Sequence, residues 1–345
     1  MKKDQSERTI TGVINFDEEI QRIKNIIFDF RKGHIKRNIA ITAEPLAGKT
    51  TLINYIKDFL DDEAVKITLN AAVKDIKELD KVNGPEKIVI LDDAQYLYIR
   101  AIGGYDILEH FLDMTTNNDK LFITSWNVFS WNYLDQIFRL NSYFPERVEL
   151  PEFDDKDMEE LLLARFRLNE VTLIEDVEIE NKSLYWIHKY RFSTGPFRDL
   201  SIPVPEVNYR YFQLLLKPDQ RAPTATKKTI FTKLSEVSNG NPGIAIVLWG
   251  KAVNVDTVRS SDIKDPSRDV SLDLSEAYVL SMILSMKSIT YDDLSQANIG
   301  IKDLNEALYQ LSVKGLIRSH NHTYRIVPEA LKSIVKNLKS ARQVW

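Results

Sequence analysis

The chain contains no cysteine among its 345 residues. This absence excludes disulfide bonds, thiolate nucleophiles and cysteine-based zinc sites, and it is natural for a protein of a reducing interior. The sequence also lacks a run of about 18 apolar residues, the length that a membrane-spanning helix needs. No apolar core follows the charged N-terminus, so the pattern of a secretory signal is missing as well. We therefore expect a cytoplasmic protein with no membrane span.

A strong excess of one charge is absent too. Lys and Arg total 46 against 50 Asp and Glu, which gives a formal net charge of -4. This balance argues against broad nonspecific attraction to nucleic acid, although a local basic face could still exist. Hydrophobic residues make up 43%, an ordinary value for a soluble chain, and the length favours two or three domains with a core each.

The most informative segment present is the octapeptide Ala43-Glu44-Pro45-Leu46-Ala47-Gly48-Lys49-Thr50, which joins a short apolar run to an amphipathic helical pattern. A buried strand, a loop ending in Gly-Lys-Thr and a helix that opens there form an anion site, because backbone N–H groups and the positive helix N-terminus face the phosphates. Lys49 adds charge, and the Thr50 hydroxyl can coordinate Mg²⁺. Ala43 stands where the motif usually has its first glycine. The alternative is an ordinary strand-to-helix turn with a surface lysine.

This motif predicts a phosphate-binding loop for ATP or ADP with Mg²⁺. The residues that we expect to bind the nucleotide share this loop or the first turn of its helix, and they are Glu44, Pro45, Leu46, Ala47, Gly48, Lys49, Thr50 and Thr51.

A second motif is the pair Asp92-Asp93, which follows the continuous apolar run Lys87 to Leu91. Such a run is typical of a strand buried on both faces of a parallel sheet. Ligands bind at the carboxyl ends of these strands, so the pair is well placed. Asp92 can hold Mg²⁺, and Asp93 can orient or deprotonate the attacking water. An Asp-Asp pair that only caps a loop is the alternative.

Three further strands are expected at Ala64 to Asn70, Leu121 to Ser125 and Arg147 to Leu150, with helical patterns between them. This alternation predicts a three-layer α/β fold around a parallel sheet. Thr124, Ser125 and Asn127 end the fourth strand and could sense the terminal phosphate; they could equally cap the next helix.

The rest of the chain reads as helical, except for a long aromatic segment. We expect helices at 154–168 and 229–237, a break at Ser238 to Gly243, and a further helix from Ile244. Three helical patterns at 275–286, 290–297 and 301–313 then precede two short strands, 315–319 and 322–327, around a turn at His320-Asn321. This is the order of a winged helix.

Together these motifs resemble those of AAA+-related P-loop ATPases of the STAND and archaeal ATPase type. The phosphate loop and the double aspartate match the two nucleotide motifs, and the segment Val13 to Ile20 resembles the part that packs near the adenine. Gly240-Asn241-Pro242 resembles the Gly-x-Pro lid motif. The resemblance covers nearly the whole chain except residues 169–228. It implies a P-loop core at 1–152, a helical lid at 153–268 with an aromatic and basic insertion at about 169–228, and a winged-helix domain at 269–345.

The resemblance also implies roles for single residues. Ile14 and Pro242 would join the nucleotide-binding set, and Asn127 would join Lys49 and Asp93 among the catalytic residues. Arg139 or Arg147 could reach the phosphate of a neighbouring subunit as an arginine finger, although surface salt bridges are the alternative.

Several departures from the family pattern point to slow hydrolysis. Phe16 stands where an arginine is common, Asp93 replaces a longer glutamate, and Gly243 and Ile244 occupy the region of the lid arginine. These departures favour a slow switch over a fast motor.

The C-terminal domain and the insertion leave the partner open. The third helical pattern of this domain carries one lysine against two acids, which suits a relay module better than a DNA reader. Two basic sets could contact a partner or nucleic acid, or be plain solvated or packed surface. They are Lys332, Lys336, Lys339 and Arg342 in the tail, and Arg191, Arg198, Arg210 and Arg221 in the insertion, whose aromatic content argues against disorder. The aromatic residues Trp126, Phe129, Trp131 and Tyr133 fit a core or a partner surface.

The sequence therefore predicts a slow, Mg²⁺-dependent ATPase that switches the position of its lid and winged helix. Its partner would be a protein or a second copy of the chain. A DNA-binding AAA+ ATPase that loads or regulates a replication, transposition or defence machine is the alternative hypothesis, and a catalytically dead nucleotide-binding scaffold is a third.

Overall fold

The computed structural model describes residues 14–166, 171–174, 185–191, 201–207, 223–254, 257–265, 270–297 and 303–344. Its centre is a sheet of five parallel strands in the order β2-β3-β4-β1-β5. The strands span the ranges β1 (Ile39–Ala43), β2 (Ala64–Thr68), β3 (Ile88–Asp92), β4 (Leu121–Asn127) and β5 (Glu146–Glu149). β1, β3 and β4 are buried along their whole length, as their continuous apolar runs predict.

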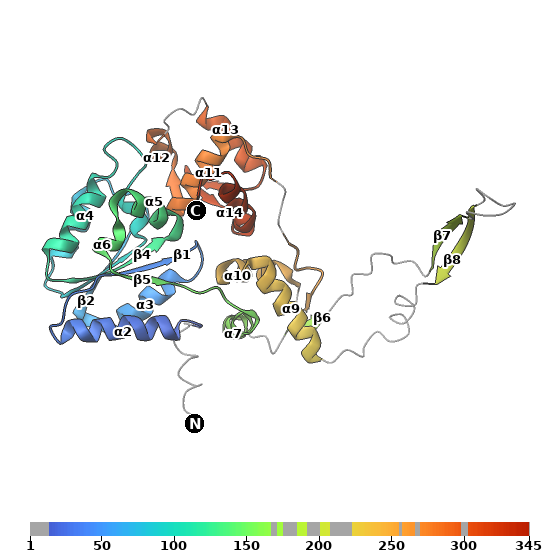
Figure 1. Cartoon of the computed structure of the whole chain (residues 1–345), viewed down its shortest axis with the longest axis horizontal. Coiled ribbons are helices and arrows are strands. Elements are labelled where there is room, and N and C mark those ends of the chain that lie inside the picture. Colours follow the sequence, from blue (N-terminus) through green and yellow to red (C-terminus); the bar gives the residue numbers. More distant parts are fainter. Residues whose placement is uncertain are drawn as a thin grey trace, which may run out of the picture.

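Helices cover both faces of this sheet. Figure 1 shows α2 (Asp17–Arg31) and α3 (Lys49–Leu60) on one side, and α4 (Asp106–Asn117), α5 (Val128–Phe138) and α6 (Leu140–Tyr143) on the other. Short 3-10 turns η1 (Asp61–Glu63), η2 (Ile76–Asn83) and η3 (Ala94–Leu97) complete the connections. The predicted α/β fold with three layers is confirmed. Because all five strands run the same way, the loops after β1, β3 and β4 meet at one edge of the sheet.

The aromatic residues at the end of β4 belong to the core. Trp126 and Trp131 are fully buried and pack edge to face with centroids 5.7 Å apart, and Phe129 is 4% exposed. Tyr133 is half-buried and donates to or accepts from Tyr105 at 2.7 Å. This cluster is therefore core packing, and the alternative of a partner surface is wrong.

The middle of the chain forms a helical unit of α7 (Asp155–Arg165), α9 (Pro223–Ser238) and α10 (Pro242–Ala252). Residues 172–174 form β6 (Thr172–Ile174), which pairs with β10 (Thr257–Arg259), and β10 pairs with β9 (Val253–Asn254). A hairpin joins β7 (Tyr185–Arg191) and β8 (Ser201–Val207) in antiparallel register. The expectation of a less regular stretch at 169–228 is therefore wrong for these strands, of which β8 contains the prolines Pro203 and Pro205. Arg198, Arg210 and Arg221 lie outside the described residues, as does Val13.

The last part of the chain, called here the C-terminal unit, comprises the described residues 270–297 and 303–344. It contains α11 (Leu274–Met286), β11 (Ser288–Thr290), α12 (Tyr291–Gln296), α13 (Leu304–Val313), β12 (Ile317–His320), β13 (Thr323–Ile326), η5 (Pro328–Ala330) and α14 (Leu331–Ser340). The three strands form an antiparallel sheet in the order β11-β13-β12. The three helices and the two hairpin strands follow one another as the sequence predicts, whereas the strand β11 between the first two helices was not predicted.

Two details of this unit differ from the sequence prediction. The hairpin turn lies at Asn321 and His322, which have φ of 48° and 56°, one residue later than expected. Two successive residues with positive φ are typical of a two-residue hairpin turn. Arg342 lies beyond the end of α14, so the predicted basic stripe does not continue along the helix to this residue. Lys332 donates to the backbone oxygen of Glu236 in α9 at 2.8 Å, which makes it a packing residue.

Within the described ranges, no helix combines the length and the apolar character that crossing a bilayer requires.

Candidate functional site

The loop between β1 and α3 is shaped by one glycine. Gly48 precedes α3 with a φ of 96°, in the left-handed region that L side chains rarely adopt. A Cβ atom at this position would lie 3.2 Å from the ring of Phe16, which is itself buried. Gly48 therefore lets the loop turn tightly under Phe16 and brings the N-terminus of α3 toward the carboxyl edge of the sheet.

Lys49 is the buried cation of this loop. Its side chain is folded back so that Nζ donates to the backbone oxygens of Ala43 at 3.0 Å and Glu44 at 2.7 Å. Burial lowers the pKa of Lys49 to about 8, with Asp93 raising it and Lys287 lowering it further. A buried ammonium that has only carbonyl partners gains most from an anionic ligand.

The other predicted loop residues surround this lysine. Thr50 and Thr51 are exposed in the first turn of α3, where hydroxyl groups can meet a ligand. Pro45 is buried, and Leu46 is exposed with a φ of 68°. Two further positions, Ala47 and Glu44, are half-buried, and burial raises the pKa of the Glu44 carboxyl.

Asp92 is the fully buried carboxylate at the end of β3. Its Oδ1 accepts a hydrogen bond from Ser125 Oγ at 2.6 Å. Its Oδ2 has no hydrogen-bond donor, and the nearest cation is Lys66 Nζ at 3.6 Å. A buried carboxylate oxygen without a donor is costly unless a further partner satisfies it. This oxygen therefore fits a water or a Mg²⁺ ion held beside it.

No group of three or more His, Asp or Glu side chains among the described residues could hold a metal ion. A Mg²⁺ ion bound with nucleotide phosphates needs only one or two protein ligands. Asp92 and Thr50 are of the right chemical kind for this task, since both offer oxygen.

Asp93 is held by three groups around the same edge. Its backbone has a φ of 61°, and its N–H donates to Ser125 Oγ at 2.8 Å. Its Oδ1 accepts from Gln95 Nε2 at 2.9 Å, and its Oδ2 accepts from Lys287 Nζ at 2.5 Å. Ser125 thus bonds to both aspartates at once, and Lys287 brings in the C-terminal unit.

The polar residues of β4 divide between structural and site positions. Thr124 Oγ1 donates to the Ile39 oxygen at 3.2 Å and accepts from Trp126 Nε1 at 2.7 Å, so its predicted contact with a phosphate is wrong. Its hydroxyl group thus bonds to neighbouring residues inside the sheet. Ser125 serves the aspartates and does not cap the helix.

Asn127 caps the next helix and also contacts the C-terminal unit. Its Oδ1 accepts from the Phe129 N–H at 3.1 Å, which is the capping interaction that the sequence left as an alternative. Its Nδ2 donates to the backbone oxygen of Leu284 at 2.6 Å. Leu284 lies in the last turn of α11, where helix carbonyls lack intrahelical partners. In this conformation, Asn127 therefore joins the sheet to α11.

The motif Gly240-Asn241-Pro242 contacts the phosphate loop directly. Asn241 caps α10 with Oδ1 and donates from Nδ2 to the Pro45 oxygen at 2.9 Å. Gly243 N–H donates to the Leu46 oxygen at 3.2 Å, and a Cβ on Gly243 would lie 2.6 Å from Leu46. Pro242 begins α10 between these two contacts. The helix therefore abuts the loop, and the close approach leaves no room for a side chain at Gly243.

The remaining predicted residues are less closely connected with the loop. Ile14 is 8% exposed and belongs to the core cluster together with Phe16. Arg139 is exposed at the far end of α5, roughly 18 Å along that helix from Asn127. Arg147 donates to Thr42 Oγ1 at 3.1 Å and lies over the Trp131 ring. The structure does not bring either arginine to the loop of its own chain.

A cleft of about 710 Å³ opens beside these groups. The phosphate loop and Asp93 line one side, and the C-terminal unit lines the other. Its lining includes Pro45, Leu46, Asp93, Lys287, Arg318 and Arg325. Three cations from the C-terminal unit therefore face the loop.

Sequence reasoning assigned no role to four residues of this region, although Asn241 was part of the Gly240-Asn241-Pro242 motif. Asn241 had a usable signal, because an Asn-Pro pair before an apolar helix is a typical capping sequence. Gln95 and Lys66 gave no signal, since their roles depend on the packing of neighbouring strands. Lys287 is the one charged residue between Glu276 and Asp292, and this was its only trace in the sequence.

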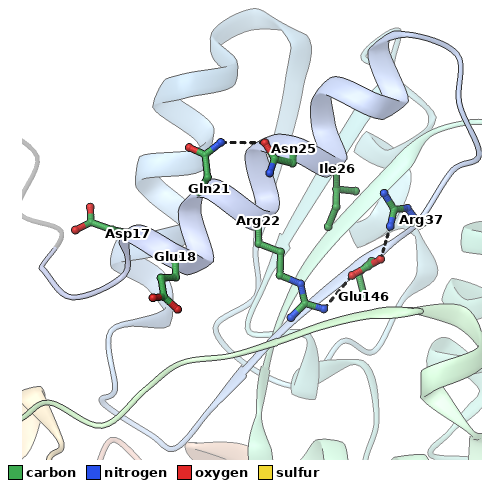
Figure 2. A pocket seen from close by; sticks show the side chains of 8 residues that line it. All are labelled: Asp17, Glu18, Gln21, Arg22, Asn25, Ile26, Arg37 and Glu146. Atoms are coloured by element: carbon green, nitrogen blue, oxygen red, sulfur yellow. Dashed lines mark hydrogen bonds and ion pairs between the residues drawn. The ribbon is translucent and has the colours of Figure 1, made fainter.

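A second hollow, of about 590 Å³, lies along α2. Figure 2 shows Arg22 and Arg37 pointing toward Glu146, with which both form ion pairs at 2.9 and 2.6 Å. These side chains satisfy one another, so the hollow carries no group aimed at a ligand.

Neither a family model nor a curated protein matches the chain. Among solved structures, it is similar to RuvB of Thermotoga maritima, a Holliday junction branch migration motor, at 14% identity over 92% of this chain and 94% of that chain, with a TM-score of 0.43. It is also similar to Cdc6p of Pyrobaculum aerophilum, at 14% identity over 95% and 94% of the two chains, with a TM-score of 0.42. Orc1 of Aeropyrum pernix, solved in complex with DNA, gives 12% identity, coverage of 96% and 93%, and a TM-score of 0.39. At such values, the similarity carries no inference about activity, substrate or partner.

Proposed function

We propose that this chain is a Mg²⁺- and ATP-dependent molecular switch, an AAA+-related P-loop ATPase in which the bound nucleotide controls the positions of a helical lid and a C-terminal winged-helix domain. One observation carries the proposal. The buried cation Lys49 and the carboxylates of Asp92 and Asp93 share one edge of the sheet, and the C-terminal unit is bonded to that same edge through Lys287 and Leu284. A ligand at this edge that competes for Asp93 or Asn127 would therefore shift the C-terminal unit.

The proposed division of labour follows from the chemistry of each group. Lys49 and the N-terminal amides of α3 hold the β- and γ-phosphates. Thr50 and Asp92 hold Mg²⁺, which neutralises phosphate charge when bound. Asp93 positions the attacking water. We propose domain limits of 1–152, 153–268 and 269–345 for the core, the lid and the winged helix.

Slow hydrolysis is part of this proposal. The Asp93 carboxyl is one carbon shorter than a glutamate, and it already accepts hydrogen bonds from Gln95 and Lys287. Both carboxylate oxygens of Asp93 thus already have a close donor, which competes with a water for the same oxygen. Water activation therefore requires Asp93 first to lose a partner.

The test is nucleotide binding and single-turnover hydrolysis by three variants. We expect Lys49→Ala to lose Mg²⁺-nucleotide binding, and Asp93→Asn to bind but to hydrolyse at least 100-fold more slowly, in the range of a general-base contribution of about 10²–10⁴. Lys57→Ala, on the same helix as Lys49, is the matched control and should behave as the wild type. Equal binding by Lys49→Ala and wild type would contradict the proposal.

A DNA-binding ATPase is the second candidate, and one observation favours it. Lys336 and Lys339 are exposed on α14 and Arg342 follows that helix, which gives a local basic surface in a weakly acidic chain. Against it, the exposed part of α13 carries Glu306, Tyr309 and Val313, which suit a protein partner better. DNA affinity that falls steeply with salt and is lost in the triple variant Lys336→Ala, Lys339→Ala and Arg342→Ala would establish the DNA function.

A scaffold without hydrolysis is distinguished by the same kinetics. If the wild type binds Mg²⁺-ATP but converts none of it in a single turnover, and Asp93→Asn is indistinguishable from it, the chain is a nucleotide-binding scaffold.

A further inference from the structure

Lys287 is a cation of the C-terminal unit that lies at the proposed catalytic carboxylate. It follows the last turn of α11 with a φ of 65°, between this helix and β11. Its Nζ lies 2.5 Å from Asp93 Oδ2. The side chain of Asp93 is 6% exposed and that of Lys287 is 44% exposed. One side of the ammonium thus contacts a buried carboxylate, and the other side is open to the cleft.

The same ammonium belongs to one electrostatic group with the phosphate loop. Lys287 and Asp93 both act on Lys49, with opposite effects on its charged form. The cleft that contains Lys287 is also lined by Pro45 and Leu46 of the loop. An anion bound above Lys49 would therefore lie within the field of Lys287 as well.

The surroundings of Lys287 favour an anion over a cation. Arg318 and Arg325, which are opposite each other in the register of β12 and β13, line the same cleft. Asp93 is the only carboxylate among the residues that line it. The cations in this part of the cleft thus outnumber the carboxylates, and a polyanion entering it gains charge-assisted hydrogen bonds.

We propose that Lys287 is the residue that distinguishes ATP from ADP, by exchanging the Asp93 carboxylate for the terminal phosphate of the nucleotide. The inference rests on the proposed function and names the residue through which nucleotide state reaches the C-terminal unit. With ADP, or without nucleotide, the ammonium stays on Asp93 and keeps that carboxylate from activating water. With ATP, it moves to the terminal phosphate, and Asp93 becomes free to accept a hydrogen bond from water.

The exchange has a mechanical consequence, because Lys287 lies between two contacts of the C-terminal unit. Asn127 donates to the Leu284 oxygen just before it, and Tyr96 OH bonds to Ser288 Oγ at 2.5 Å just after it. A movement of Lys287 toward the phosphate loop therefore changes the geometry of both hydrogen bonds. By thermodynamic linkage, a contact that stabilises the C-terminal unit in its present position must weaken the binding of ATP relative to that of ADP.

The experiment measures the affinities of the full chain for Mg²⁺-ATPγS and Mg²⁺-ADP by calorimetry. The variant is Lys287→Met, which keeps the length of the side chain and removes the charge. We expect the affinity for ATPγS to fall about tenfold to hundredfold, the range for a hydrogen bond between charged groups, with a change of less than about threefold for ADP. Lys287→Arg should retain most of the preference of the wild type.

Lys339→Met is the matched control. Lys339 is an exposed cation of the same unit that acts on Glu44 of the loop but does not contact Asp93. The Lys339→Met variant should change the affinities for ATPγS and ADP by equal factors. Equal losses for ATPγS and ADP in Lys287→Met, or no loss for either, would overturn the inference. In both cases the wild type still binds ATPγS and ADP, which distinguishes them from failure of the proposed function, in which the wild type binds neither nucleotide.

A second measurement separates the exchange from simple loss of folding. Thermal unfolding of nucleotide-free Lys287→Met should remain cooperative, and added ADP should raise its Tm by as much as it raises that of the wild type. The quantity to compare is the Tm rise with ATPγS minus the Tm rise with ADP. If this difference is as large in Lys287→Met as in the wild type, Lys287 does not distinguish the nucleotides.

Discussion

At the scale of residues, the site is defined by charged side chains that are buried before any ligand arrives. Lys49 is 7% exposed, Asp92 is fully buried and Asp93 is 4% exposed. Lys49 has only carbonyl partners and Asp92 Oδ2 has no hydrogen-bond donor, which is less than a buried charge usually requires. The fold thus maintains a polar site whose groups are best satisfied by a bound polyanion and its cation.

The first residue prediction concerns pH. Burial holds the pKa of Lys49 at about 8 in the nucleotide-free protein, and bound phosphates favour the ammonium form. Above about pH 8, binding must therefore take up a proton, and affinity should fall toward about tenfold per pH unit. Calorimetry in buffers of different ionisation enthalpy should show proton uptake that is near zero at pH 7 and approaches one per nucleotide by about pH 9.5. Absence of uptake at the higher pH would contradict this account of Lys49.

The same shift affects the stability of the nucleotide-free protein. Because the folded pKa lies below the ordinary lysine value of 10.5, the unfolded chain binds more protons between about pH 8 and pH 10.5. The Lys49 contribution to the free energy of unfolding therefore rises with pH through this window. Lys49→Met, which has no proton to lose, is the control and should show a smaller rise than the wild type.

The second residue prediction concerns Ser125, which sequence reasoning assigned to phosphate sensing or capping. Its hydroxyl bonds to both Asp92 and the Asp93 N–H. Ser125→Ala leaves two buried polar groups with fewer partners, so we expect a loss of about 1–3 kcal/mol in the free energy of unfolding. Urea denaturation measures it. Ser340→Ala, on the surface of α14, should cost less than about 0.5 kcal/mol, and a similarly small cost for Ser125→Ala would rule out the structural role.

At the scale of elements, much of the sheet could be predicted from the sequence. The continuous apolar runs of β1, β3 and β4 predicted both their positions and their burial, because each run is short and bounded by polar residues, which favours a buried strand over a helix. β6 was missed because it has only three residues, and β7 and β8 were missed because charged residues in β7 and prolines in β8 interrupt their apolar pattern. The contacts of Lys287 with Asp93 and of Asn127 with Leu284 could not be found, since they join residues more than 150 positions apart in the chain.

The element prediction concerns the contact between α10 and the phosphate loop. Gly243→Ala places a Cβ 2.6 Å from Leu46, whose backbone oxygen is equally close. We expect α10 to be pushed from the loop, with a loss of about 1–3 kcal/mol in unfolding free energy, as in overpacked cores, and weaker nucleotide binding. Gly250→Ala, in the same helix with nothing within 4 Å, should instead stabilise by about 0.5–1 kcal/mol. Stabilisation by both substitutions would show that the close approach is absent in solution.

At the scale of the whole molecule, the sheet, the helical unit and the C-terminal unit all meet at one edge. Asn241 and Gly243 contact the loop from one side, while Lys287 and Leu284 contact Asp93 and Asn127 from the other. Figure 1 shows α10 and α11 both near the carboxyl ends of the central strands. A small ligand at this edge would therefore lie close to the contacts that join the sheet to the helical unit and to the C-terminal unit. A switch requires such an arrangement.

The most direct test of the central claim uses the absence of cysteine. In Ser288→Cys, the single thiol replaces a side chain that is 5% exposed and bonded to Tyr96 across the boundary between the sheet and the C-terminal unit. We predict that a maleimide labels it slowly without nucleotide and with Mg²⁺-ADP, and about tenfold faster or more with Mg²⁺-ATPγS, in the usual range of allosteric coupling. Ser340→Cys, on exposed α14, should be labelled at one rate throughout. Equal labelling of Ser288→Cys with both nucleotides bound would contradict the switch.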